Sequence, residues 1–161
     1  MAQNSVTFRP ATPADTPQIL SFIKLLAEYE KLSDEVAATE ALLNEWLFEQ
    51  KRAEVIFGEV ENEVICFALF FYNFSTFLGR GGLYLEDLYV KEHHRGKGYG
   101  KAILKELARL AVERGCGRLE WQCLDWNKPS IKFYLSLNAR PMDDWTVYRL
   151  TGDSLLKMAT N

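Results

Sequence analysis

The sequence is short of the residues that metal sites and disulfide frameworks require. Its 161 residues include only two histidines, the adjacent His93 and His94, and three cysteines, Cys66, Cys116 and Cys123, which show no CxxC spacing. Two adjacent histidines without a second ligand cluster do not make a metal site, so no metal is expected. An odd number of unpatterned cysteines is typical of reduced thiols, which predicts a cytoplasmic protein.

Long apolar runs and an excess of basic charge are also missing. The most apolar stretch, VICFALFFY, is far too short to cross a bilayer as a helix. The formal net charge of −3 argues against a nucleic-acid-binding protein, because such proteins usually carry a basic surplus. The first ten residues contain no basic segment followed by an apolar run, so no signal peptide is expected. The length suits a single domain over residues 1–161.

The order of hydrophobic patterns along the chain predicts an α/β fold. β-Branched and aromatic runs predict strands over residues 5–9, 53–60, 63–73, 81–91, 118–124 and 144–151. Apolar residues at helical spacing predict helices over residues 13–31, 39–50, 100–115 and 128–137. Thr39 is expected to cap the second helix, and Gly115 and Asn138 to end the last two in the left-handed conformation. This mixture predicts a sheet with both parallel and antiparallel neighbours.

Residues 93–101, HHRGKGYGK, alternate glycine with basic side chains between a predicted strand and an amphipathic helix. Glycine lets the backbone approach a ligand without a Cβ in the way, and a helix N-terminus offers unpaired N–H groups to an anion. The GxGxG spacing differs from the GxxxxGK[ST] of phosphate loops and from the GxGxxG of dinucleotide folds. The stretch predicts a phosphate-binding loop, and the residues alone leave a solvated loop open as the alternative.

Five segments in order resemble the Gcn5-related N-acetyltransferase (GNAT) family, and within it the diamine acetyltransferases of the spermidine/spermine and thialysine branch. The segments are LAEYEKL, LYLEDLYV, RGKGYGK, LDWNKPSIKFY and LLKMAT. The resemblance implies a mixed, twisted sheet with helices on both faces and acetyl-coenzyme A (acetyl-CoA) in the gap between two splayed parallel strands. It also implies a homodimer that transfers acetyl to a primary amine of a small cation such as a polyamine.

The resemblance assigns three segments to acetyl-CoA. Backbone amides at the end of the fourth predicted strand would pair with the pantetheine arm, the glycine loop would hold the pyrophosphate, and a turn before the last predicted helix would complete the site. These residues are Leu88, Tyr89, Val90, Arg95, Gly96, Lys97, Gly98, Tyr99, Gly100, Lys101, Asn127, Lys128, Pro129 and Ser130.

Two adjacent carboxylates, Glu86 and Asp87, interrupt an apolar predicted strand. Burying an unpaired carboxylate is costly, and neighbours in a regular strand point to opposite faces unless a bulge re-aims one of them. Structural pairing with a buried arginine or with backbone amides is one interpretation. The resemblance instead places both residues where diamine acetyltransferases hold their polyamine, with Glu86 also taking the amine proton through water.

The resemblance extends the substrate pocket to side chains that would otherwise fit an ordinary polar surface. These are Tyr29, Glu30, Glu120, Gln122 and Asp144.

Tyr134 shares a predicted helical face with Ile131 and Leu137, so its ring is expected to point inward. The residues alone leave open a core tyrosine whose hydroxyl finds any partner, whereas the resemblance implies a general acid that protonates the departing CoA thiolate. Two other functions stay open: an acetyltransferase for thialysine, another lysine-like amine or a protein amine, and a non-catalytic domain that senses CoA.

Overall fold

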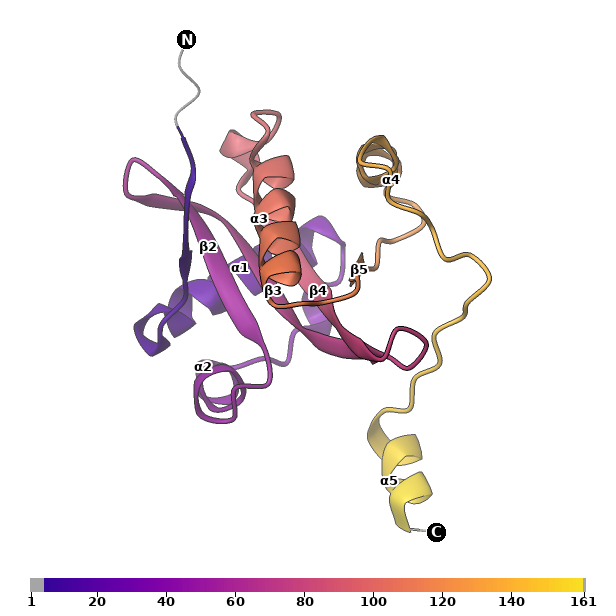
Figure 1. The fold of residues 1–161 in the computed structure, drawn as a ribbon. Coiled ribbons are helices and arrows are strands. Elements are labelled where there is room, and N and C mark those ends of the chain that lie inside the picture. Colours follow the sequence, from indigo (N-terminus) through magenta and orange to yellow (C-terminus); the bar gives the residue numbers. More distant parts are fainter. Residues whose placement is uncertain (1–4, 161) are drawn as a thin grey trace. The chain divides into compact units, whose positions relative to one another are not determined.

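The computed structural model describes residues 5–160, which form two compact units with a boundary after Gln122. The first unit contains the sheet and the helices up to Glu113, and the second contains two short helices (Figure 1). Across residues 5–160, no helix has both the length and the apolar character that a bilayer span needs.

The first unit is built on a five-stranded mixed sheet in the order β1-β2-β3-β4-β5. The strands are β1 (Thr7–Pro10), β2 (Glu54–Val60), β3 (Glu63–Ser75), β4 (Arg80–Val90) and β5 (Leu119–Trp121). The first four pair antiparallel in sequence order, and β5 pairs parallel with β4. The predicted mixed α/β sheet is therefore confirmed.

Helices cover both faces of this sheet, with α3 in front of it and α1 behind it in Figure 1. They are α1 (Thr16–Tyr29), α2 (Glu40–Asn44), a π-helical turn (Glu45–Glu49) that continues α2, and α3 (Tyr99–Glu113). Thr39 caps α2 as predicted, because its hydroxyl accepts a hydrogen bond from the Leu42 N–H at 3.2 Å. Gly115 ends α3 with φ of 71°, also as predicted.

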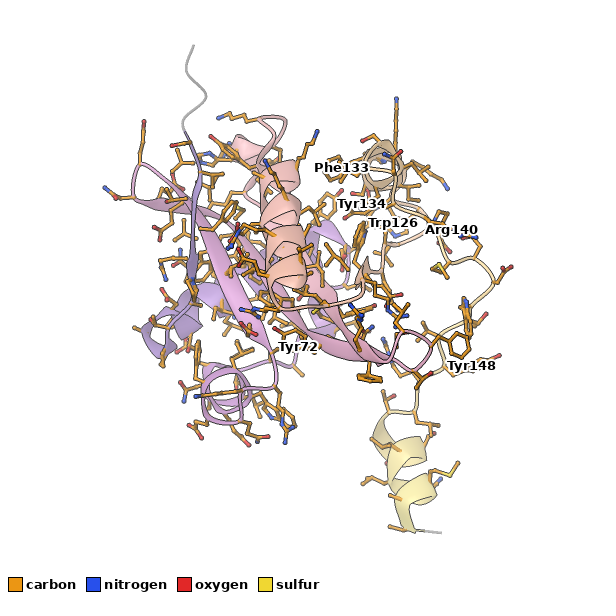
Figure 2. The ribbon with its side chains drawn as sticks, in the orientation of Figure 1. Tyr72, Trp126, Phe133, Tyr134, Arg140 and Tyr148 are labelled. Carbon is orange, nitrogen blue, oxygen red and sulfur yellow. The ribbon has the colours of Figure 1, made fainter. Side chains whose placement is uncertain are left out.

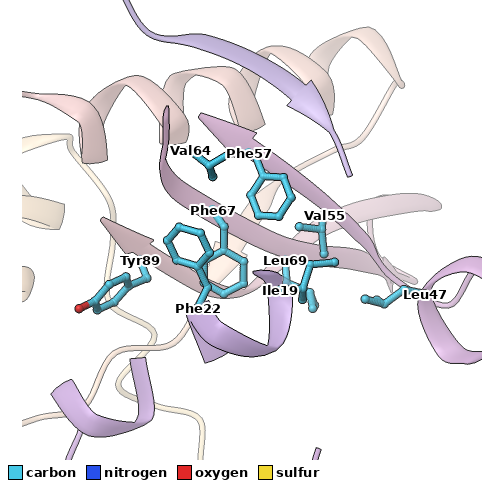
Figure 3. Packing of buried hydrophobic residues seen from close by; sticks show 9 residues of the cluster. All are labelled: Ile19, Phe22, Leu47, Val55, Phe57, Val64, Phe67, Leu69 and Tyr89. Carbon is cyan, nitrogen blue, oxygen red and sulfur yellow. The ribbon is translucent and has the colours of Figure 1, made fainter. Parts of the chain in front are cut away.

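One hydrophobic core lies between α1 and the sheet (Figure 3). The ring of Phe22, from α1, stacks on Phe67 of β3 with 5.0 Å between centroids. Burying an apolar side chain of this size contributes about 1.5–3 kcal/mol to stability. Tyr89, near the end of β4, packs edge-on against Phe22 at 6.2 Å. The core therefore extends to the end of β4 and fixes the strand where the candidate site begins.

The opposite face of the sheet packs against α3. Cys66 lies on this side of β3, opposite Gly58 of β2, and is fully buried. A Cβ at position 58 would lie only 2.4 Å from the sulfur, so glycine is what makes room for it. Burial raises the pKa of the Cys66 thiol to about 12. A buried thiol with a raised pKa is unreactive, so Cys66 acts as a packing group of the sheet.

The second unit contains α4 (Lys128–Ser136) and α5 (Gly152–Thr160). Asn138 follows α4 with φ of 61°, which confirms the predicted left-handed cap. The strand predicted over residues 144–151 is wrong, because these residues form neither strand nor helix. A strand needs a neighbour to bond its N–H and C=O groups, and residues 123–160 of this unit contain no other strand.

Candidate active site

A β-bulge at Glu86 determines which way the side chains of β4 point. Asp87 pairs with Leu69 of β3, and Leu85 pairs with the very next residue of β3, so Glu86 has no partner of its own. Because residues alternate along a strand, this extra residue puts Asp87 on the same face as Tyr84 instead of the opposite one. The bulge that could bring side chains of this segment together is therefore present, and the shared face is the one that α1 covers.

Three carboxylates interact electrostatically at this bulge: Glu86, Asp87 and Glu30, which directly follows α1. Burial, together with the negative charges of Glu86 and Glu30, raises the pKa of Asp87 to about 6. Burial also raises the pKa of Glu30. Within residues 5–160, no lysine, arginine or histidine forms an ion pair with any of the three. The group is a negative site that lacks its own counter-charge.

Tyr84 also belongs to this face, although its spacing from Asp87 in the sequence predicts opposite faces. Its ring lies 5.2 Å from that of Phe71, centroid to centroid. Burial and the charges of Glu86 and Glu120 raise the pKa of its hydroxyl, which therefore stays protonated at neutral pH. The bulge is the reason why sequence periodicity missed Tyr84.

Glu120, a predicted substrate contact on β5, already has partners in the structure. Its Oε1 lies 2.6 Å from Nε of Arg118 and accepts a hydrogen bond from Nδ2 of Asn73 at 3.0 Å. Gly82 leaves space for this group, because a Cβ there would lie 2.4 Å from Asn73 Oδ1. Arg118 therefore offsets the charge of Glu120. Gln122, two residues further on, is exposed beyond the end of β5.

The last part of β4 has a strand neighbour on one side only, since its pairing with β5 stops at Leu85. The Lys91 N–H donates to the Ile65 carbonyl at 2.9 Å. Because bonded and non-bonded pairs alternate in an antiparallel ladder, the N–H and C=O groups of Leu88 and Val90 then point away from β3. They lie on the edge where the pantetheine arm was predicted to pair, and the Val90 carbonyl there already accepts from Arg95. By the same alternation, the N–H and C=O of Tyr89, which was predicted for this edge too, point toward β3.

The glycine loop joins β4 to α3 and has the backbone shape that an anion site needs. Gly96 and Gly98 have φ of 73° and 84°, where a side chain would be strained. α3 begins directly after Gly98, so its first N–H groups lack a preceding turn to bond. A Cβ at Gly96 or Gly100 would meet no atom within 4 Å, so the loop is open there. Together with the exposed Lys97 and Lys101, these features fit a pyrophosphate.

Arg95, the first basic residue of this loop, has three partners in the structure. Its Nε donates to the Val90 carbonyl at 3.0 Å. Its Cζ lies 4.9 Å from the ring centroid of Tyr29, the last residue of α1, and 5.0 Å from that of Tyr89. A residue predicted for the acceptor pocket, Tyr29, is thus in contact with residues predicted for acetyl-CoA.

The histidines before the loop are not arranged as metal ligands. His94 Nε2 lies 3.5 Å from an oxygen of Glu63, and its ring is 6.2 Å from that of Tyr99. Among the side chains that the structure describes, no group of three or more His, Cys, Asp or Glu residues could hold a metal ion.

The second unit holds the remaining predicted residues. Asn127 is buried and caps α4, its Oδ1 accepting from the Ser130 N–H at 3.3 Å, so the segment 127–130 forms the first turn of the helix. Tyr134 follows on the same helix, half-buried, with its ring 5.5 Å from that of Phe133 (Figure 2). Asp144 is exposed in a turn where the Trp145 N–H bonds the Met142 carbonyl.

Comparisons with known proteins add independent findings. The model of the acetyltransferase (GNAT) family matches residues 19–138. The chain is 36% identical to thialysine N-epsilon-acetyltransferase of Sus scrofa, over 96% of the chain and 98% of that protein. It is 30% identical to spermidine/spermine N(1)-acetyltransferase-like protein 1 of Homo sapiens, over 99% of the chain and 25% of that protein. An integron cassette protein from the mobile metagenome of V. cholerae has a similar structure, with a TM-score of 0.81, 31% identity and coverage of 98% and 99%.

Proposed function

Because the chain belongs to the acetyltransferase (GNAT) family and is an enzyme that uses acetyl-CoA, we propose that its acceptor is a primary amine of a small polycation such as spermidine. The family predicted from the five sequence segments is thereby confirmed. The observation that carries the acceptor proposal is the group of Glu30, Glu86 and Asp87, which no described basic side chain neutralises. An aliphatic amine with a pKa of about 10.4 arrives protonated and supplies that charge.

The charge of the acceptor pocket favours a polyamine over an amino acid. An amino acid acceptor brings a carboxylate that would need a basic partner, but Arg118 is paired with Glu120 and Arg95 is held by two rings and a carbonyl. A polyamine carries positive charge only and leaves these contacts intact. Thialysine or a related lysine-like amine is the second candidate, because of the 36% identity to an enzyme named for it.

The proposed reaction is direct transfer within a ternary complex. Glu86, which is exposed, accepts the ammonium proton through water, while Glu30 and Asp87 hold the remaining positive charge of the acceptor. The neutral nitrogen bonds to the thioester carbonyl carbon, the carbon–sulfur bond breaks, and the nitrogen releases its second proton to solvent as the amide forms. Tyr134 gives its phenolic proton to the departing thiolate and regains a proton from solvent.

Acetyl-CoA would be held by the chain's own backbone and basic residues. Leu88 and Val90 would pair with the pantetheine arm, the loop of residues 95–101 would hold the pyrophosphate, and residues 127–130 would complete the site. Both units would contribute to one acetyltransferase domain, which is supported by a family match that crosses the boundary after Gln122. A homodimer and a cytoplasmic location stay predictions.

The test is release of free CoA thiol from acetyl-CoA by the wild type and by Tyr134→Phe. The acceptors are spermidine, spermine, putrescine, lysine, thialysine, L-ornithine and a lysine peptide. We expect turnover with a polyamine and a kcat about 100-fold lower in Tyr134→Phe, because the thiolate loses its proton donor. The KM for acetyl-CoA should change little.

Three results would contradict parts of this proposal. Turnover of amino acids alone would retain acetyl transfer and replace the polyamine by the second candidate. Turnover of the peptide alone would assign a protein acceptor. An unchanged kcat in Tyr134→Phe would remove the general-acid role of that residue.

A further inference from the structure

We propose that Arg95 is a positioning residue that couples the acetyl-CoA loop to the acceptor carboxylates through the ring of Tyr29. The inference rests on the proposed function, because it concerns the acceptor pocket of the same reaction. Arg95 directly precedes Gly96 of the loop, and Tyr29 directly precedes Glu30 of the pocket. One contact between side chains therefore joins the two binding regions.

The geometry of Arg95 uses both properties of a guanidinium group. Its N–H donates in the plane to the Val90 carbonyl at 3.0 Å, while its cationic carbon lies 4.9 Å and 5.0 Å from the ring centroids of Tyr29 and Tyr89. Tyr89 and Val90 belong to β4, and Tyr89 is fixed in the core. Arg95 thus connects the end of α1 to the rigid end of β4.

The end of α1 needs such a support, because its own anchors in the core come earlier. The buried residues of α1 end at Ala27, and Tyr29 is 38% exposed. The N–H of Glu30 bonds to the Leu26 carbonyl at 2.9 Å, and that of Leu32 bonds to the Ala27 carbonyl at 2.8 Å. The position of the Glu30 carboxylate depends on this last turn, and the contact with Arg95 restrains it.

A ligand that orders the loop would therefore also order the acceptor pocket. When the pyrophosphate binds beside Arg95, the loop becomes less mobile. The Tyr29 ring, which contacts Arg95, then becomes less mobile too. The coupling is reciprocal by linkage, so the acceptor amine should in turn strengthen binding of acetyl-CoA.

The first test measures the KM for the amine and the KM for acetyl-CoA separately in two single variants and the double variant. Arg95→Lys keeps the charge but cannot donate in the plane and cover two rings, and Tyr29→Leu removes one ring. We expect each to raise the KM for the amine roughly fivefold or more, the usual range of coupling between sites. The double variant should raise the KM for the amine no further than the single variant with the larger increase, because both substitutions remove the same contact.

Arg114→Lys is the matched control. Arg114 also lies over two aromatic rings, with Cζ 5.8 Å from the Phe70 centroid and 5.9 Å from that of Tyr72, and it pairs with Glu54 at 2.7 Å. It lies just beyond the other end of α3, away from the loop. The same substitution there should leave both KM values unchanged.

The second test needs no turnover. Hydrogen exchange in a peptide that spans residues 26–35 should be faster in Arg95→Lys and Tyr29→Leu than in the wild type, and unchanged in Tyr29→Phe, which keeps the ring. Addition of CoA should slow this exchange in the wild type and not in Arg95→Lys.

These readouts distinguish the failure of this inference from that of the proposed function. Unchanged exchange in Arg95→Lys overturns the coupling, whether or not any amine is acetylated. An increase in the KM for acetyl-CoA alone, with additive effects in the double variant, also overturns it and leaves Arg95 as a phosphate ligand only. A wild type that acetylates no amine contradicts the proposed function, and the exchange data still decide the coupling.

Discussion

The two halves of β4 are both extended, but they differ in strand pairing, burial and charge. Before the bulge, Leu83 and Leu85 are buried and pair with strands on both sides. After it, residues 87–90 pair with β3 alone, and the first of them, Asp87, has a carboxylate whose pKa is raised. The first half supplies stability, and the second half offers open backbone groups and negative charge.

The difference shows how little is needed to turn a structural strand into a binding strand. One extra residue, Glu86, shifts the alternation and re-aims Asp87. The early end of β5 then leaves an edge unpaired. Both changes occur within two residues, so substitutions on either side of this point should have opposite consequences.

The largest expected effect contrasts the neighbours Glu86 and Leu85. Glu86→Gln removes the proposed proton acceptor at an exposed position, so kcat/KM for the amine should fall by about 100-fold. The urea midpoint should not fall, because the substitution also removes a negative charge that acts on the buried Asp87. Leu85→Ala leaves a cavity on the buried face of the sheet opposite α1, so the free energy of unfolding should fall by about 2–5 kcal/mol. The folded fraction of Leu85→Ala should keep its kcat/KM. If Glu86→Gln retained full activity, the division between the halves would not hold for catalysis.

A smaller effect concerns the pH dependence of stability through Asp87. Its pKa is about 6 in the folded protein and 3.8 in its ordinary state, so the ionised group lowers stability. The cost is fully present above about pH 6 and is relieved as the pH falls from about 6 to about 4. Asp87→Asn should raise the free energy of unfolding at neutral pH by on the order of 2–3 kcal/mol and flatten this dependence.

Urea unfolding between about pH 4 and pH 7 checks this expectation. Glu30, whose pKa is also raised by burial, contributes in the same direction and should leave a residual slope. The amine KM of Asp87→Asn should rise, because the pocket loses a charge. A wild-type pH dependence in Asp87→Asn would show that Asp87 ionises in the folded protein at its ordinary pKa.

The smallest expected effect is a difference in the KM for acetyl-CoA between alanine substitutions at two glycines with positive φ, one in the loop after β4 and one at the far end of α3. Gly98 and Gly115 flank α3 with φ of 84° and 71°, so alanine at either should lower the free energy of unfolding by about 1 kcal/mol. Only Gly98→Ala should raise the KM for acetyl-CoA, since only that loop is proposed to hold pyrophosphate. Equal KM values in the two variants would argue against this role of the loop.

The helices and strands of the first unit could be predicted because their periodicity is strong and local. Ile103, Leu107 and Ala111 of α3 are spaced for one helical face and are buried. The strand expected over residues 144–151 has a suitable composition, but composition does not supply a pairing partner. Its failure to form reflects a requirement that lies outside the segment.

The sequence predicts which residue types the site contains, but not the contacts that depend on strand register or on segments far apart in the chain. Arg118 and Glu120 are two residues apart in the predicted strand over residues 118–124, so the sequence pattern already puts them on one face and allows the ion pair that the structure contains. The bulge at Glu86 depends on the register of β3, which no local pattern records. The contact of Arg95 with Tyr29 joins segments far apart in the chain, and only the folded sheet brings them together.

Because Cys66 is enclosed opposite Gly58, the rate at which its thiol is alkylated measures how often the sheet opens. A thiol with a pKa of about 12 and no exposed surface reacts with an alkylating reagent only after the sheet separates. Cys116 and Cys123 are partly exposed and should react first. The slow labelling phase would then report, in minutes or hours, how often the centre of the sheet comes apart, without any denaturant.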